Sequence, residues 1–174
     1  MSGNTVIAHF VTTQIHFQQV EKKKDADTWI TKVLETLQAD IVYLDAPLSL
    51  PAAYFGTGES YHYREADKIT RAMSPMFLGG LTARAMSLKA SLSTLIFHEI
   101  YPAFFQSELV QSTHYKEDIT LFLQDLAKIE AFTLGEQPTN WHQVDALIAL
   151  LIGTRHQEQR HQEIGNPTEG IIII

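Results

Sequence analysis

Residues 41–51 read Ile41-Val42-Tyr43-Leu44-Asp45-Ala46-Pro47-Leu48-Ser49-Leu50-Pro51. Four apolar residues with high strand propensity lead straight into a carboxylate, and two prolines follow. A continuous apolar run of this length is typical of a parallel strand that is buried on both faces. Proline cannot donate a hydrogen bond to a sheet, so the strand should end near Ala46. The segment therefore predicts an α/β protein with Asp45 at the carboxyl end of a central strand.

Asp45 itself has two interpretations. Open α/β sheets bind their ligands at the carboxyl ends of their strands, so the position favours a functional carboxylate. A charged side chain there is costly to desolvate unless it meets a metal, another cation or hydrogen-bond donors. However, an aspartate before a turn can equally well cap that turn. The local sequence leaves both interpretations open.

The composition limits the class of protein. A chain of 174 residues with 45% hydrophobic content can bury one good core, which predicts a single domain over residues 1–174. It has no cysteine, so disulfides and cysteine-based metal sites are excluded. No apolar window approaches the roughly 20 residues of a membrane span, and no basic region is followed by an apolar stretch, so we expect no secretory signal. We therefore expect a cytoplasmic protein without a membrane partner.

Charge and motifs narrow the function further. The net charge of -7 argues against a broad electrostatic grip on nucleic acid, but not against an enzyme that holds a phosphodiester through metal ions. The sequence contains no P-loop, no Gly-x-Gly-x-x-Gly and no Gly-x-Ser-x-Gly. Nucleotide-binding and serine-hydrolase functions of these types therefore have little support.

The pattern of the first 50 residues predicts a hairpin, a helix and the buried strand. Residues 4–10 and 15–20 are rich in β-branched and aromatic residues, and His9 and His16 would face each other across the hairpin. Apolar residues at helical spacing over 29–37 follow, with Asp25 or Asp27 as the cap.

The remaining chain predicts a helical insertion at about 52–95, followed by further strands and helices. We expect a short polar helix at 63–71, an amphipathic helix at 81–95 and a strand at 97–102. Helices at 117–132 and 141–157 follow, then a turn at Gly165-Asn166-Pro167 and a last strand at 171–174. Four terminal isoleucines would form an aggregation-prone edge if they were exposed. Either this strand docks on the domain, or it pairs between the subunits of a homo-oligomer, or the sequence is cut short.

Three carboxylates lie in unusual surroundings. Asp45 ends a buried strand, Glu99 lies within an apolar strand, and Asp145 lies beside the apolar stripe of the last helix. Carboxylates are rarely buried unless they are paired or bind a metal. Gathered in one cleft, they would hold Mg²⁺ or Mn²⁺, and two such ions about 4 Å apart can clamp a phosphodiester. The alternative is a set of separate caps and ion pairs, with partners such as Arg64, Arg84 and Lys89.

The basic residues also have two interpretations. The alternating charges of residues 64–71 are typical of a solvated helix face with i,i+4 pairs. Alternatively, Arg64, Arg71 and Arg84 form a basic flank that contacts the phosphates of an anionic substrate. His156 and His161 are five residues apart, which favours the polar end of a helix over a metal site.

A series of short segments resembles a predicted nuclease family with an RNase H-like fold, long labelled a domain of unknown function. Together they span nearly the whole chain and occur in the order expected. Ala66 stands where the family often has cysteine. The segments are Asp45–Pro51, Arg64–Asp67, Leu81–Arg84, His98–Pro102, Trp141–Leu147 and Gly165–Ile171.

The resemblance implies a mixed sheet of antiparallel and parallel strands flanked by helices. It also implies a metal site formed by Asp45 and Asp145, with Glu99 as a third ligand or supporting acid. Arg64 and Arg84 would steady phosphates or orient the carboxylates. The family has a first central strand with a Gly-x-Asp motif before the match to residues 3–5, and this strand is absent here. We therefore expect a gap between the hairpin and the Asp45 strand, filled by a segment upstream of Met1, by the isoleucine strand or by a second chain.

Three functions follow as hypotheses. The first is a metal-dependent nuclease or phosphodiesterase that acts on nucleic acid or a small phosphodiester. The second is a non-catalytic module that keeps the fold and binds a ligand or partner in the same cleft. The third is an oligomer-forming scaffold that pairs through Ile171–Ile174.

Overall fold

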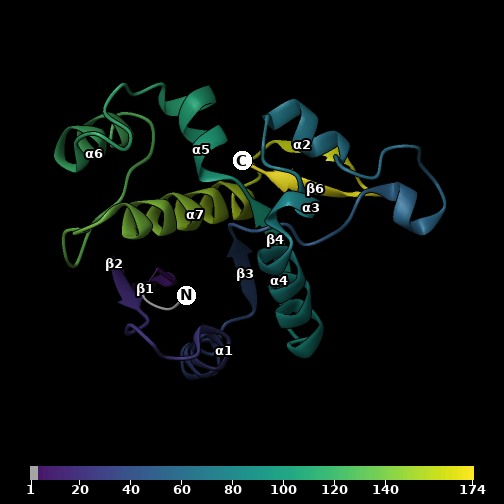
Figure 1. Ribbon diagram of the computed structural model, residues 1–174. Helices are drawn as coiled ribbons and strands as arrows, with labels where there is room; N and C mark the ends of the chain where they lie inside the picture. Colours follow the sequence, from purple (N-terminus) through teal and green to yellow (C-terminus); the bar gives the residue numbers. More distant parts are fainter. Residues whose placement is uncertain (1–3) are drawn as a thin grey trace.

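The computed structural model describes residues 4–174 and contains two separate sheets (Figure 1). An antiparallel hairpin joins β1 (Val6–Val11) to β2 (Gln14–Gln19). The second sheet has the order β3-β4-β6-β5, in which β3, β4 and β6 are parallel and β5 is antiparallel to β6. Its strands are β3 (Ile41–Leu44), β4 (Ile96–Ile100), β5 (Glu163–Asn166) and β6 (Gly170–Ile173). The predicted α/β architecture with mixed strand directions is confirmed.

Helices connect and cover these strands. None of those within residues 4–174 is long and apolar enough to cross a membrane. The region predicted as a helical insertion contains a 3₁₀ turn and three helices. In chain order the elements are α1 (Ala26–Leu37), the 3₁₀ turn η1 (Ala52–Phe55), α2 (Glu65–Thr70), α3 (Pro75–Leu78), α4 (Gly80–Ser91), α5 (Pro102–Phe105), the π-helical turn η2 (Gln106–Val110), α6 (Ile119–Leu126) and α7 (Trp141–Gln157).

The N-terminal hairpin and α1 follow the sequence prediction closely. His9 and His16 face each other in the hairpin register, as expected. The carboxylate of Asp25, and not that of Asp27, caps α1 by accepting hydrogen bonds from the amides of Asp27 (2.9 Å) and Thr28 (3.3 Å). This cap satisfies amides that have no partner inside the helix.

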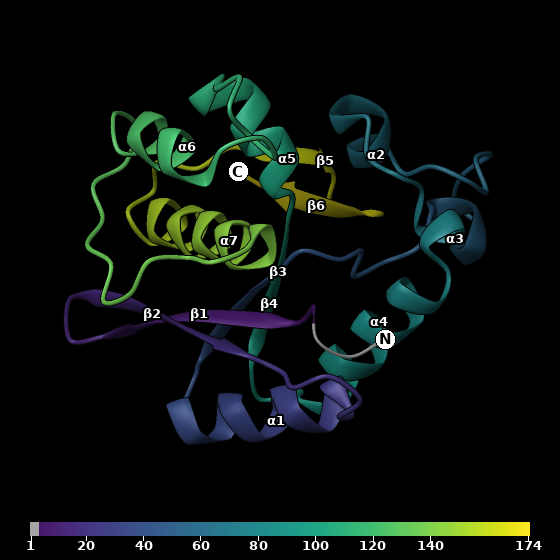
Figure 2. The same cartoon turned by 60° about the vertical axis from the view of Figure 1, so that its left-hand side comes forward.

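α7 forms the centre of the main core. Its residues Val144, Leu147, Ile148, Leu151 and Ile152 are buried. The helix packs against β1, β2, β3 and α5, and it lies between the hairpin and α5 in both views (Figures 1 and 2). A helix with so many apolar positions gains its stability from burial, mainly through the hydrophobic effect.

A second cluster of buried residues holds β3 and β4 against α4. Ala46, Leu48, Ala85, Leu88 and Phe97 form it, and partly buried side chains from α1 and β3 pack against it. β3 therefore has α7 on one face and the α1–α4 side on the other. The coverage of both faces agrees with the prediction, but the predicted central position is wrong, because within residues 4–174 β3 is an edge strand that pairs only with β4.

The C-terminal isoleucines dock on the domain. Ile172, Ile173 and Ile174 are buried, and β6 is paired on both edges, with β4 on one side and β5 on the other. β5 itself was not predicted. Gly165 and Asn166, predicted as part of a turn, belong to this strand, and the turn lies at residues 167–169.

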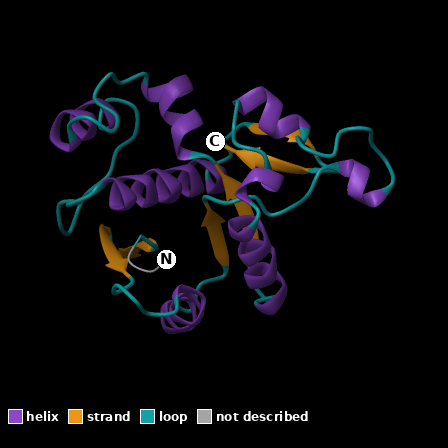
Figure 3. Cartoon of the chain, viewed as in Figure 1, coloured by secondary structure: helices purple, strands orange, loops and turns teal. Residues whose placement is uncertain are grey.

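The hairpin does not join the second sheet. Within residues 4–174, no ladder connects β1 to β3, although both strands pack against α7 (Figure 3). The hairpin and the Asp45 strand therefore lie in separate sheets, where the resemblance implied a single mixed sheet. The suggestion that the isoleucine strand fills this separation is wrong, because β6 lies on the far side of β4.

Three predicted boundaries are also wrong. The helix predicted at 117–132 is limited to α6, with Ile129 exposed and Phe122 buried. The helix predicted at 81–95 runs from Gly80 to Ser91. The strand predicted to reach Pro102 ends at Ile100, because Pro102 takes the first position of α5. Proline is favoured there, since its missing amide hydrogen has no partner in the first turn of a helix.

Candidate active site

The candidate site lies at the carboxyl ends of β3 and β4. Asp45 follows β3 directly, and Glu99 pairs with Leu44, the last residue of that strand. Asp45, Glu99, Arg64 and Tyr101 line a pocket of about 220 Å³ together with largely apolar neighbours. These neighbours include Met73, Leu78, Leu81 and Ile172.

Asp45 is the carboxylate with the most perturbed titration. Its side chain reaches solvent, yet the surrounding protein desolvates it and raises its pKa to about 7. The negative charges of Asp145 and Glu99 raise the pKa further, whereas the ammonium group of Lys116 opposes them. Like charges disfavour a second ionised carboxylate nearby. The three predicted acids therefore interact electrostatically at one end of the sheet.

Asp145 is oriented by two side chains that the sequence analysis did not identify. The Tyr115 hydroxyl donates to its Oδ1 at 2.7 Å, and the Lys116 ammonium donates to its Oδ2 at 2.6 Å. Burial and the charge of Asp145 raise the pKa of Tyr115, so the phenol stays protonated and keeps donating. Neither residue had a signal in the sequence, because both lie in an irregular segment before α6 and reach Asp145 only through the fold.

Glu99 is held by Arg64 in a buried ion pair. Nη2 of Arg64 lies 2.6 Å from Glu99 Oε1, and Nη1 lies 2.7 Å from Oε2. The same guanidinium contacts Asp67, whose Oδ1 is 2.6 Å from Nη2. The side chains of all three residues are nearly inaccessible to solvent. Such planar, two-pronged pairing suits arginine and fixes the direction of both carboxylates.

The ion-pair cluster of Arg64, Asp67 and Glu99 connects several of the short segments that resemble the nuclease family. The amide of Leu48 donates to Glu99 Oε2 at 2.8 Å, and Nη1 of Arg64 donates to Ser49 Oγ at 2.8 Å. Ser49 in turn donates to the carbonyl of Glu169, in the turn before β6. The turn after Asp45 is therefore fastened to β4, α2 and the β5–β6 turn. In this position Arg64 holds the carboxylates of Glu99 and Asp67 in place.

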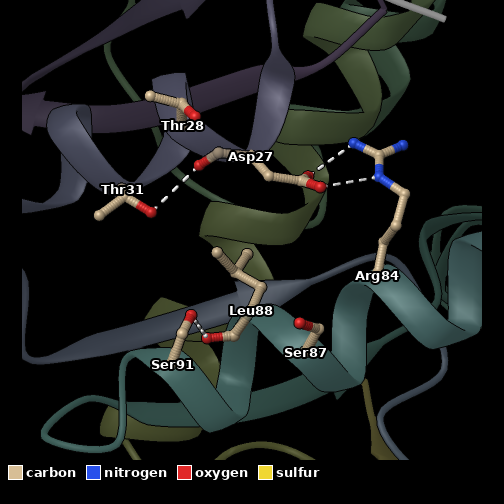
Figure 4. Close-up of a pocket in the computed structure, with 7 residues that line it drawn as sticks. All are labelled: Asp27, Thr28, Thr31, Arg84, Ser87, Leu88 and Ser91. Carbon is tan, nitrogen blue, oxygen red and sulfur yellow. Dashed lines mark hydrogen bonds and ion pairs between the residues drawn. The ribbon is translucent and has the colours of Figure 1, made fainter.

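Arg84 belongs to a different part of the molecule. Its guanidinium binds the Asp27 carboxylate in α1, with Nη2–Oδ1 and Nε–Oδ2 distances of 2.6 and 3.0 Å (Figure 4). This pair borders a separate pocket between α1 and α4, also of about 220 Å³. Thr28, Thr31, Ser87, Leu88 and Ser91 complete that lining. Arg64 therefore shares a pocket with Asp45, whereas Arg84 does not line it.

Three histidines gather beside Tyr43 of β3, near the C-terminal end of α7. Nδ1 of His156 lies 2.8 Å from the hydroxyl of Tyr43, and its ring centre is 4.4 Å from that of His98 and 4.5 Å from that of His161. Burial lowers the pKa of both His98 and His156. Within the part of the chain that the structure describes, no group of three or more His, Cys, Asp or Glu residues is arranged to hold a metal.

A divalent cation nevertheless suits the chemistry of the Asp45–Asp145 pair. Both side chains offer the hard oxygen ligands that Mg²⁺ and Mn²⁺ prefer. The Lys116 ammonium is a cation that already partly neutralises this pair, because it binds Asp145 and lowers the pKa of Asp45. Glu99 is placed differently, since Arg64 and the Leu48 amide engage both of its oxygens.

Comparison with protein-family models, with curated proteins and with solved structures finds no match. The comparisons therefore place the chain in no family. The functional argument depends on the geometry and electrostatics of the site.

Proposed function

We propose that this protein is a divalent-metal-dependent phosphodiesterase or nuclease, with a site built on Asp45 and Asp145. The observation that carries the proposal is the position of Asp45 at the carboxyl end of β3, where burial and then the negative charge of Asp145 from α7 raise its pKa to about 7. A perturbed acid in a pocket at this edge of a sheet is a candidate for catalysis. The RNase H-like resemblance of the sequence points to the same residues, and it remains an analogy.

The proposed roles follow from the contacts of each residue. Asp45 and Asp145 would hold Mg²⁺ or Mn²⁺, which when bound activates water and stabilises charge on the phosphate. Tyr115 keeps Asp145 in place through its hydroxyl. Glu99 and Arg64 are positioning residues, because they fix the turn after Asp45 through the Leu48 amide and Ser49.

The volume of the pocket and the net charge of the protein favour a small substrate. The pocket beside Asp45, at about 220 Å³, is smaller than the roughly 300–1,000 Å³ of sites that enclose a drug-sized ligand. A net charge of -7 provides no long-range attraction for a polyanion. We therefore infer that the site takes one phosphodiester group, from a small molecule or from a short stretch of nucleic acid, in the cytoplasm.

Cleavage assays test this proposal. The full chain is incubated with Mg²⁺ or Mn²⁺ and with single-stranded DNA, RNA or bis(p-nitrophenyl) phosphate. Asp45→Asn and Asp145→Asn should each reduce cleavage at least about 100-fold, the scale expected for loss of a catalytic group. Asp125→Asn is the matched control, because Asp125 is also bonded by a lysine but lies elsewhere. Absence of cleavage with every substrate and both ions would contradict the proposal.

A non-catalytic binding module is the second candidate. It is favoured by the fact that protein groups already engage both oxygens of Asp145 and of Glu99. An Asp45→Ala variant that preserves cellular function, in a protein that cleaves none of the substrates, would support this candidate.

A scaffold that oligomerises through Ile171–Ile174 is the third candidate, but β6 itself has no free edge, because it pairs with β4 on one side and β5 on the other. Sedimentation equilibrium of the full chain measures its oligomeric state. A monomer at high concentration would contradict the scaffold.

A further inference from the structure

Lys116 is placed differently from an ordinary surface lysine. Its side chain is 45% exposed, but its ammonium lies 2.6 Å from Asp145 Oδ2, and the Asp145 side chain is only 19% exposed. The ammonium also lies 4.8 Å from the ring centre of Tyr115 and 5.5 Å from that of Trp141. Aromatic faces attract cations at these distances. A carboxylate and two aromatic rings therefore hold the ammonium at the edge of the candidate site.

The same ammonium acts on the second acid. Its positive charge attracts the Asp45 carboxylate and opposes the repulsion from Asp145. One positive charge thus partly neutralises two carboxylates. Without it, the pair would carry a larger negative charge whenever both acids are ionised.

We propose that Lys116 is a displaceable internal counter-ion that competes with a divalent cation for Asp145. The inference rests on the proposed function, because it concerns the same pair of acids. A cation that binds Asp145 Oδ2 takes the position of the Lys116 ammonium, and two positive centres that close repel each other. Binding of the ion therefore releases Lys116 to solvent, where its long side chain is already partly exposed.

The neutral variant Lys116→Gln isolates this competition. Exposed ion pairs and cation–π contacts are individually weak, so we expect Mn²⁺ to bind Lys116→Gln about three- to tenfold more tightly than the wild type. Mn²⁺ binding to the full-length proteins is measured by electron paramagnetic resonance, which detects the free ion and needs no enzymatic activity. Lys116→Arg keeps the charge and should bind Mn²⁺ like the wild type.

Lys128→Gln is the matched control for net charge. Lys128 is also exposed and also binds an aspartate, with Nζ 2.7 Å from Asp125 Oδ1. Both variants make the protein more negative by one charge, so a general electrostatic effect would appear in both. Only Lys116→Gln should gain affinity, and Asp145→Asn in the same background should remove the gain.

Equal affinities of Lys116→Gln and Lys128→Gln would overturn the inference, as would the absence of Mn²⁺ binding in both the wild type and Lys116→Gln. Tighter binding by Lys116→Gln together with no cleavage of any substrate would support the counter-ion and contradict the hydrolase. Cleavage by the wild type with unchanged affinity in Lys116→Gln would support the hydrolase and contradict the counter-ion.

Discussion

Arg64 shows how strongly one buried residue can determine the surroundings of a site. Replacing it with methionine leaves Glu99 and Asp67 buried without their guanidinium partner. Loss of one member of a buried ion pair costs about 3–5 kcal/mol, so we expect Arg64→Met to lower the free energy of unfolding by that amount. Urea unfolding followed by circular dichroism measures the change.

Arg84→Met is the matched control for this substitution. Its ion pair with Asp27 is about 40% exposed on both sides, and exposed pairs contribute at most about 1 kcal/mol. If both variants lost the same small amount of stability, the structural role assigned to Arg64 would be wrong.

Asp45 predicts a distinctive pH dependence of stability. Its pKa is about 7 in the folded protein against an ordinary value of 3.8, so between these pH values the folded state holds a proton that the unfolded state has lost. The contribution of Asp45 to the free energy of unfolding therefore falls as the pH rises from about 4 to 7. In metal-free buffer, Asp45→Asn should match the wild type near pH 4 and be more stable at pH 8. The gain should stay within about 1 kcal/mol, because water screens the exposed carboxylate.

Thermal unfolding of both proteins across this pH range measures the difference. A gain in stability that is the same at pH 4 and pH 8 would mean that Asp45 has an ordinary pKa.

At the scale of single residues, the candidate carboxylates could be identified from the sequence, but the side chains that bind them could not. Asp45 and Asp145 could be chosen because a carboxylate stood out beside an apolar run. Arg64 could not be placed, since alternating charges are also typical of a solvated helix and its burial depends on Glu99, 35 residues away. Lys116 and Tyr115 reach Asp145 across about 30 residues, and no local pattern encodes that contact.

Among the elements, β5 depends on a glycine with an unusual conformation. Gly165 has φ +108, and a Cβ atom built on it would lie 2.6 Å from the Cβ of Ala66 in α2. Both the backbone and the close contact oppose any larger residue. We expect Gly165→Ala to lower the free energy of unfolding by roughly 1–3 kcal/mol, measured by urea unfolding.

Gly80→Ala provides the control, because nothing lies within 4 Å of the corresponding Cβ position at the start of α4. Alanine is a better helix former than glycine, so this variant should be as stable as the wild type or slightly more stable. A Gly165→Ala protein as stable as Gly80→Ala would contradict the packing of α2 on β5.

The elements that could be predicted are those with a strong local pattern. α7 was predicted at its observed residues because its apolar positions recur at helical spacing, and β3 because its apolar run is continuous. β5 has only one clear apolar residue, Ile164, and exists because β6 pairs with it. The short helix α5 was missed, since Pro102 is as compatible with the end of a strand as with the start of a helix.

At the scale of the whole molecule, β3 has one open edge. β3 pairs with β4, and within residues 4–174 no strand pairs with its other edge. The amide of Ile96 donates to the carbonyl of Asp40 at 2.9 Å, so the alternation of a parallel ladder directs the amides of Val42 and Leu44 to β4. The amide of Tyr43 then points to the open edge.

Hydrogen exchange measured by nuclear magnetic resonance tests this arrangement. The Tyr43 amide should exchange much faster than those of Val42 and Leu44, because its protection requires a further strand. Equal protection of all three amides would show that another strand, such as one from a second copy, covers the edge.

The order of the hairpin, α1 and β3 could be predicted, and a gap beside the Asp45 strand was expected only from the family resemblance. Composition and periodicity contain no information about which strands pair across long stretches of chain. The position of β6 between β4 and β5 therefore had to come from the structure.

The central claim is that Asp45 and Asp145 together hold a divalent cation. Mn²⁺ is paramagnetic, so titrating small amounts of it into the ¹⁵N-labelled full chain broadens the amide signals nearest to the bound ion. We predict that signals around Asp45, Tyr101 and Asp145 broaden first, and that Asp45→Asn abolishes the effect. Broadening that centres on Asp27 and Arg84, or no site-specific broadening at all, would contradict the claim.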